Sequence, residues 1–178
     1  MPRRPVDEWW GLPGGSVADP ERPIAGAATE VAAVRDAQTI AARIARDEAA
    51  ADEARRQYLT AGLPTIEPDA AFAAVAQPEE QLHAIRTTAL LETGSGVGTG
   101  LPRGGTLYLS SARILHLGTQ TTEVRTSDIA EMAVVLERLI LIRRRDGSDL
   151  AIEVDQPRLL RVQLASAIAA ERARAGTS

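Results

Sequence analysis

Residues 105–116 read GTLYLSSARILH and form the most informative segment of this chain. The run from Thr106 to Ser110 is rich in residue types that favour a strand, and so is the run from Arg113 to Leu117. The polar pair Ser110-Ser111 stands between them and suits a turn. We therefore predict a β-hairpin at this point of the chain.

Further short strands are predicted on both sides of this hairpin, with turn residues between them. A glycine-rich loop follows the first of them, at residues 93–105. The dipeptide Asp146-Gly147 predicts a hairpin turn of type I′ between the last two. The seven predicted strands are residues 82–92, 106–110, 113–117, 121–125, 129–136, 139–142 and 150–154.

An amphipathic helix is predicted after the last strand. Pro157 suits its first position, and Leu160, Leu164, Ala167 and Ile168 recur at helical spacing on one face. Seven short strands followed by one such helix form a specific order, because the helix can cover the open end of a bent sandwich.

The segment 105–116 resembles the hairpin motif of GRAM and bacterial PH-like domains. In these families a GTLYLT strand turns through a polar pair into arginine and hydrophobic residues. Ser127-Asp128-Ile129-Ala130-Glu131 is similar to their segment before the middle strands. The resemblance implies an α+β fold, a PH-like seven-stranded antiparallel β-sandwich or barrel capped by a C-terminal helix. It also implies structural roles for Tyr108 and Arg113, and a module that docks on lipid or protein and is not an enzyme.

The chain is predicted to divide into four parts: a disordered tail at 1–25, a long Ala-rich helix at 26–62, a connector at 63–80 and the PH/GRAM-like domain at 81–175. Gly62 and Pro64 mark the end of the long helix. Its heptad seam is weak, since Glu48 and Arg55 interrupt the apolar positions, so we expect a solvated helix that leans on the domain more than a coiled coil. A short helix with Phe72 is expected in the connector.

Composition excludes several classes of chemistry. The chain has no cysteine and its 20 basic residues are all arginine, so disulfides, thiolate metal sites, Schiff-base catalysis and a P-loop lysine are ruled out. The lack of lysine and asparagine indicates a GC-rich bacterial source. Without a predicted signal peptide or membrane span, we expect a cytoplasmic protein.

Charge is unevenly distributed along the chain. Residues 1–81 hold 8 arginines against 14 acidic residues, and residues 82–178 hold 12 against 10. The imbalance suggests two units with different partners, and neither half is basic enough to indicate nucleic acid.

The candidate binding residues are two aromatic and four cationic side chains. Trp9 and Trp10 form either an anchor in the tail or an aromatic pair folded onto the domain. Arg143, Arg144 and Arg145 form the densest basic run, which reads either as a surface for anionic lipid or as a solvated hairpin. Phosphoinositide-binding PH domains carry several cations in the first loop, whereas Arg103 is the one arginine there.

No catalytic, metal or cofactor set is predicted. The glycines at 94, 96, 98 and 100 do not match GxGxxG, and the two histidines lie in no known ligand spacing. We expect no cofactor and no metal. The favoured function is a non-catalytic docking or adaptor module that binds a protein partner or a second copy through the domain and the helical arm. One alternative is peripheral binding to anionic membrane lipid through the arginine hairpin, which would make the protein membrane-peripheral. Another is an enzyme or ligand-binding domain whose glycine loop closes over a small molecule.

Overall fold

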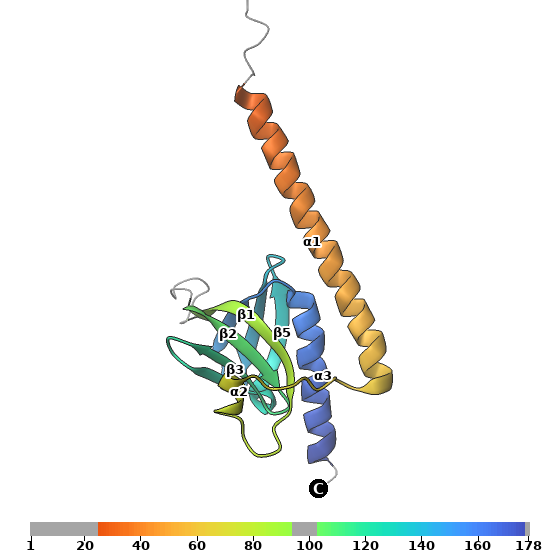
Figure 1. The fold of residues 1–178 in the computed structure, drawn as a ribbon, viewed down its shortest axis with the longest axis vertical. Coiled ribbons are helices and arrows are strands. Elements are labelled where there is room, and N and C mark those ends of the chain that lie inside the picture. Colours follow the sequence, from red (N-terminus) through yellow and green to blue (C-terminus); the bar gives the residue numbers. More distant parts are fainter. Residues whose placement is uncertain (1–24, 94–102, 177–178) are drawn as a thin grey trace, which may run out of the picture. The chain divides into compact units, whose positions relative to one another are not determined.

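The computed structural model describes residues 25–93 and 103–176 (Figure 1). The chain forms two compact units, Met1–Thr39 and Ile40–Ser178, and the boundary falls inside the first helix. The described part of the first unit is helical, whereas the second unit holds the sheet and its covering helices. The elements are α1 (Ala25–Ala61), α2 (Ala70–Ala73), β1 (Leu82–Thr93), β2 (Arg103–Ser110), β3 (Arg113–Gly118), β4 (Thr122–Arg125), the 3-10 turn η1 (Thr126–Asp128), β5 (Ile129–Val135), β6 (Leu139–Arg144), β7 (Asp149–Glu153) and α3 (Pro157–Ala175).

The seven strands are antiparallel and hydrogen-bonded in the order β4-β3-β2-β1-β7-β6-β5. Strand β1 joins the two halves of this sheet, since residues 82–90 pair with β2 and residues 89–93 pair with β7. The order begins at β4 and finishes at β5, so the sheet bends as an open sandwich and does not close into a barrel. Seven antiparallel strands, the C-terminal helix and the long preceding helix confirm the predicted PH-like fold.

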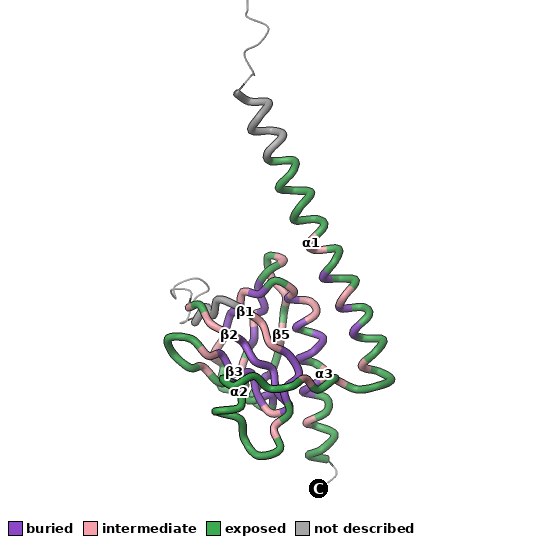
Figure 2. Tube along the Cα trace, viewed as in Figure 1, coloured by how far each residue is buried: buried purple, intermediate pink, exposed green. Residues whose placement is uncertain are grey.

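The main core lies between the inner face of the sheet and α3, along the buried segments in purple in Figure 2. The predicted helix face is confirmed, because Leu160, Leu164, Ala167 and Ile168 are all buried in this core. Each large aliphatic side chain removed from water contributes roughly 1.5–3 kcal/mol. The sheet and the residue just after β7 contribute Ala84, Leu107, Leu109, Ile114, Val124, Ile129, Ile140, Ile142, Leu150, Ile152 and Val154.

A second, smaller core covers the outer face of the β1–β2–β3 half of the sheet. The connector places Phe72 of α2 against Tyr108, with ring centroids 5.5 Å apart, and Leu82 and Leu115 complete the cluster. Asp69 caps α2 by accepting from the N–H of Phe72 at 2.8 Å, and it accepts from the Tyr108 hydroxyl at 2.9 Å. The predicted short helix is therefore present, and the structural role of Tyr108 is to hold it on the sheet.

A buried ion pair fastens the same connector to the β2–β3 hairpin. The Arg113 guanidinium donates to both carboxylate oxygens of Glu80 at 2.9 and 3.0 Å, and to the carbonyl of Val75 at 2.7 Å. Burial would raise the pKa of Glu80, but hydrogen bonds from Arg113, Gln77 and Ser110 outweigh it and leave that pKa below its ordinary value. Arg113 is thus structural, as the resemblance implied.

The hairpin turns differ from the prediction at one point. Gly147 has φ of 84°, but Asp146 is not left-handed, so the β6–β7 turn is not type I′. The backbone N–H of Gly147 bonds the carbonyl of Arg144 at 3.0 Å, and Asp146 accepts from the N–H of Ser148 at 2.9 Å instead of adopting a positive φ. Two successive left-handed residues occur at Leu136 and Glu137, in the β5–β6 turn.

Candidate functional site

Helix α3 begins without a cap from its own chain neighbours. Gln156 occupies the N-cap position and its side chain makes no capping hydrogen bond. The acceptor comes instead from α1, where Asp47 is only 2% exposed. Its Oδ2 and Oδ1 accept from the backbone N–H groups of Arg158 and Leu159 at 2.9 and 3.0 Å. A carboxylate at a helix N-terminus satisfies otherwise unpaired donors and interacts favourably with the helix dipole.

Arg158 extends this junction into an ion-pair network. Its guanidinium lies 4.0 Å from Asp47 and 3.5 Å from Glu48 on α1, and it also pairs with Glu137 in the β5–β6 turn. Hydrogen bonding from Arg158 lowers the pKa of Glu137. One side chain therefore joins α1, the start of α3 and a hairpin of the sheet.

C-terminal to Asp47, α1 packs against α3 through small apolar side chains. Ala51 and Ala54 of α1 are buried against Val162 of α3, with Tyr58 and Leu159 at the border of this cluster. Alanine allows close approach of the two helices, which explains the buried Ala51 in the otherwise weak heptad seam. These contacts explain why residues 47–58 of α1 lie against α3.

A series of side-chain hydrogen bonds lies beside that contact. Gln163 of α3 accepts from Arg86 of β1 at 3.2 Å, and its amide lies 3.5 Å from the Tyr58 hydroxyl. Burial lowers the pKa of Arg86, and the nearby Tyr58 and Asp47 only partly offset that effect. The end of α1 is thus held by hydrogen bonds as well as by apolar packing.

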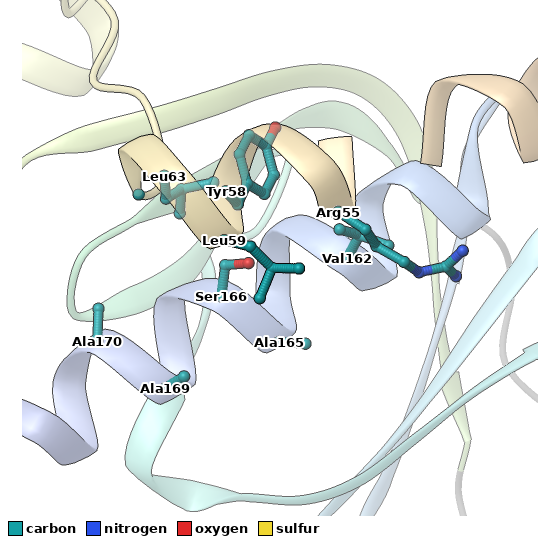
Figure 3. Close-up of a pocket in the computed structure, with 10 residues that line it drawn as sticks. Arg55, Tyr58, Leu59, Leu63, Val162, Ala165, Ser166, Ala169 and Ala170 are labelled. Carbon is teal, nitrogen blue, oxygen red and sulfur yellow. The ribbon is translucent and has the colours of Figure 1, made fainter. Parts of the chain in front are cut away.

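Beyond this contact the two helices diverge and leave a groove of about 570 Å³, shown in Figure 3. We call it the α1–α3 groove. Leu59 on its α1 side is 87% exposed, although it is a large aliphatic side chain. The α3 side is made of small residues, so the groove has an apolar floor and an open mouth. The lining residues are Arg55, Tyr58, Leu59, Gly62, Leu63, Val162, Ala165, Ser166, Ala169 and Ala170.

The α1–α3 groove is lined mainly by apolar side chains. Its ionisable groups are Arg55, which forms an ion pair with Asp52 on the same helix, and Tyr58. A nucleophile beside a base, the minimum for covalent catalysis, is not among the lining residues. Across residues 25–93 and 103–176, no group of three histidine or acidic side chains is placed to hold a metal ion. The same described residues contain no helix long and apolar enough to cross a membrane.

The predicted basic run lies on β6 and its turn, surrounded by carboxylates. Arg143 pairs with Asp149 at 3.2 Å and with Glu131 at 3.7 Å. Arg144 lies 3.9 Å from Asp146. The local positive charge is therefore largely compensated.

The other two predicted arginines lie on different elements, Arg103 at the start of β2 and Arg145 just after β6. Arg145 donates to the carbonyl of Ser127 at 2.8 Å, and Arg103 at the start of β2 donates to Gln120. Trp9 and Trp10 lie outside the described residues, and so does the segment 94–102 of the glycine loop. A binding role for these residues stays a prediction.

His116 is a further unusual side chain in the sheet. It is 1% exposed, and neither ring nitrogen has a hydrogen-bond partner among the described residues. The ring packs against the backbone of Gly105 and Gly118, where an added Cβ would come within 2.5 Å and 3.0 Å of ring atoms. Burial lowers the pKa of His116, and the charge of Arg103 lowers it further.

Sequence reasoning did not identify Asp47 or Leu59. One signal was available for Asp47, because Gln156 before Pro157 is a poor cap and requires an acceptor from elsewhere. For Leu59 there was no comparable signal, since the groove depends on the path of α1 relative to α3.

The sequence matches no family model and no curated protein. Several solved structures are similar to part of this chain at low identity. The C-terminal domain of an unknown protein from Leishmania infantum is 15% identical, with 56% of this chain and 92% of that chain covered and a TM-score of 0.45. The Vps36 N-terminal PH domain is 13% identical over 56% of this chain and 86% of its own, with a TM-score of 0.41. The N-terminal PH domain of human ARAP2 is 11% identical over 53% and 84%, with a TM-score of 0.39. The fold assignment rests on the strand order and α3, not on these distant likenesses.

Proposed function

We propose that this chain is a non-catalytic docking module that binds a protein partner through the α1–α3 groove. The observation that carries the proposal is Leu59, a large aliphatic side chain left 87% exposed beside an apolar groove of about 570 Å³. Removing apolar surface from water favours association with a partner. Exposed apolar residues that gather at one groove are typical of an interaction surface.

The composition of α3 suits an apolar helix or loop as the bound segment. Ala165, Ala169 and Ala170 are exposed on its groove side, with Ser166 half-buried between them. Small residues at successive turns let a second backbone approach closely. The resemblance of residues 105–116 to a GRAM-type motif and the arginine-only basic composition support a bacterial source for this module, for which we also propose a cytoplasmic setting.

The test is site-specific photo-crosslinking in cells followed by binding with purified components. A photoreactive residue at Leu59 should capture a partner that the same residue at Val75 does not. Val75 is the matched control, because it is also an exposed apolar side chain, 43% accessible, and lies outside the groove. The captured protein is then purified and titrated against the wild-type chain by calorimetry.

A charged substitution on the groove floor provides the decisive comparison. Ala169→Glu places an unpaired carboxylate in the apolar contact and should weaken binding by roughly ten-fold or more, as loss of an interface hot spot does. Val75→Glu should leave the affinity unchanged. Equal affinity of both variants, or equal capture from both positions, would contradict the groove as the docking site.

Membrane association through the arginine hairpin is the competing outcome. Co-sedimentation with vesicles of anionic lipid that falls with salt and with Arg143→Ala/Arg145→Ala would favour that function. We expect weak retention on such vesicles, because Asp149 and Glu131 already compensate the charge of Arg143.

A further inference from the structure

Helix α3 is strongly basic, although the whole chain has a net charge of -4. It holds four arginines against one glutamate, a net charge of +3. Three of these five charged side chains have partners within the chain. Arg158 pairs with carboxylates of α1 and of the β5–β6 turn. Arg174 donates to the carbonyl of Ser111 at 3.1 Å, and Glu171 accepts from the hydroxyl of Thr126.

Arg161 and Arg172 are the other two charged residues of α3. Both are exposed, and neither guanidinium has a hydrogen bond or an ion pair within residues 25–93 and 103–176. A cation near the C-terminus of a helix interacts favourably with the helix dipole, which suits Arg172. Arg161 lies towards the opposite, positive end of α3 and gains nothing from the dipole. Interactions inside the described chain therefore do not account for Arg161.

These two arginines border the α3 side of the α1–α3 groove at its two ends. Arg161 precedes Ala165 by four residues and Arg172 follows Ala169 by three, so each shares a helix face with an alanine that lines the groove. Figure 3 shows these two alanines along α3, with Leu59 of α1 close to them. The arginines are 11 residues apart in α3, which corresponds to about 16 Å along its axis.

The α1 side of the groove adds little net charge. Arg55 lines this side, and its charge is compensated by an ion pair with Asp52 on the same helix. An acidic group at the border of the groove would therefore meet two cations that have no direct counter-charge, whereas a basic group would be repelled. The apolar surface between the two arginines suits the apolar face of a helix, which packs lengthwise into such a groove. Charge and shape together favour an acidic, amphipathic helix.

We propose that the α1–α3 groove binds an amphipathic helix of another protein, with acidic residues along the border of its apolar face. This inference rests on the docking function proposed above and specifies the chemistry of the partner. The apolar face covers Leu59, Ala165 and Ala169. Two carboxylates three helical turns apart pair with Arg161 and Arg172. Charged pairs at the rim of an interface contribute mainly to specificity and to the rate of association.

A displayed library of helical peptides tests the chemistry of the partner. Its members have about 22 residues, enough to reach both arginines, with apolar residues on one face and Glu, Gln or Lys in equal amounts at the bordering positions. The library is depleted on the Ala169→Glu variant and then selected on the intact wild-type chain. Glu should be enriched about three-fold or more over Gln and Lys at the bordering positions.

The outcomes of this selection separate the inference from the docking function on which it rests. Binders that use Glu, Gln and Lys equally, or that prefer Lys, overturn the acidic partner and leave the groove as a docking site. A library that contains no binder sensitive to Ala169→Glu overturns the proposed function and this inference together.

Charge reversal tests the two arginines directly. Arg161→Glu and Arg172→Glu should each weaken binding of a selected Glu-containing peptide by about three-fold in calorimetry, and the double variant by about ten-fold. Replacing the glutamates of the peptide by lysines should restore binding to the double variant. Arg125→Glu is the matched control, because Arg125 on β4 is exposed, has no ion pair among the described residues and gives the same change in net charge. Equal affinity of the three single variants, or no rescue by lysine, overturns the proposal.

Two other occupants would give different results with the same variants. Sedimentation velocity of the chain alone measures self-association, and co-sedimentation with vesicles of phosphatidylserine and phosphatidylcholine measures membrane binding. Neither should depend on Arg161 or Arg172. A dimer, or vesicle retention, that is lost in the double variant overturns the proposal, because it assigns this surface to a second copy or to a membrane. Unchanged thermal unfolding of each variant verifies the fold.

Discussion

Removal of the Asp47 carboxylate is the sharpest perturbation of this structure. Asp47→Ala leaves the N–H groups of Arg158 and Leu159 without their acceptors, which lie 2.9 and 3.0 Å away in the intact protein. Loss of an N-cap residue costs about 0.5–2 kcal/mol, and the lost charge at the helix N-terminus adds about 0.3–1 kcal/mol. We expect the free energy of unfolding to fall by about 2 kcal/mol, a large share of the 5–15 kcal/mol typical of a domain.

Separation of α1 from α3 would add to this loss of stability. If α1 separates from α3 in the variant, the apolar contact of Ala51 and Ala54 with Val162 is lost too. Asp47→Asn keeps a side-chain oxygen that can accept one hydrogen bond, so its loss should be about 1 kcal/mol, roughly the charge contribution together with part of the cap.

Urea unfolding measures both variants, and amide hydrogen exchange at residues 47–58 reports on the separation of α1. Glu48→Ala is the matched control on the same helix. Its carboxylate is exposed and lies 3.5 Å from Arg158, so its removal should change stability by less than about 0.5 kcal/mol. A loss below about 0.5 kcal/mol for Asp47→Ala, or equal losses for the Ala variants at 47 and 48, would refute the role of Asp47 as the cap of α3.

The remaining predictions concern the sheet and its connector. Glu80→Gln should lower the free energy of unfolding by about 3 kcal/mol in urea titrations, because it removes the more buried of the two carboxylates that pair with Arg113 and leaves only the half-exposed Glu123; a loss below about 1 kcal/mol would mean that the pair is dispensable. Phe72→Ala should cost about 3–5 kcal/mol by the same assay and expose the outer face of β2 to proteolysis, whereas unchanged stability would show that α2 is not needed there. The pKa of His116 is lowered in the folded protein, so the unfolded chain binds more protons, and stability should fall as pH drops below the ordinary histidine value of about 6.5. The fall should flatten in His116→Gln, and an identical pH profile for that variant would exclude His116 as its source.

The strands, their order along the chain and the covering helix could be predicted from local signals. Strand-forming residues and the polar pair Ser110-Ser111 predict the β2–β3 hairpin without reference to distant contacts, and the turn itself falls one residue later, at Ser111 and Ala112. Pro157 and the spacing of Leu160 and Leu164 define α3 and its buried face in the same way. These signals act over a few residues, and the physical preferences behind them hold wherever the segment lies in space.

The backbone conformation of the turns could not be predicted from these local signals. The Asp146-Gly147 pair has a type I′ preference, but Asp146 uses its carboxylate to bond the N–H of Ser148 and keeps φ negative. Leu136 and Glu137, which carry no turn signal, take the two left-handed positions instead. Glu137 also pairs there with Arg158, a residue of another element.

The sequence by itself determined a PH-like succession of strands with a covering helix and a long helical arm, because periodicity and turn chemistry are local. Only the tertiary structure showed that Asp47 caps a helix 111 residues further along the chain, that Glu80 neutralises a buried arginine and that the arginines of β6 face carboxylates. Periodicity states which face of an element is buried, but not which residue lies opposite it. The α1–α3 groove depends on that second kind of information.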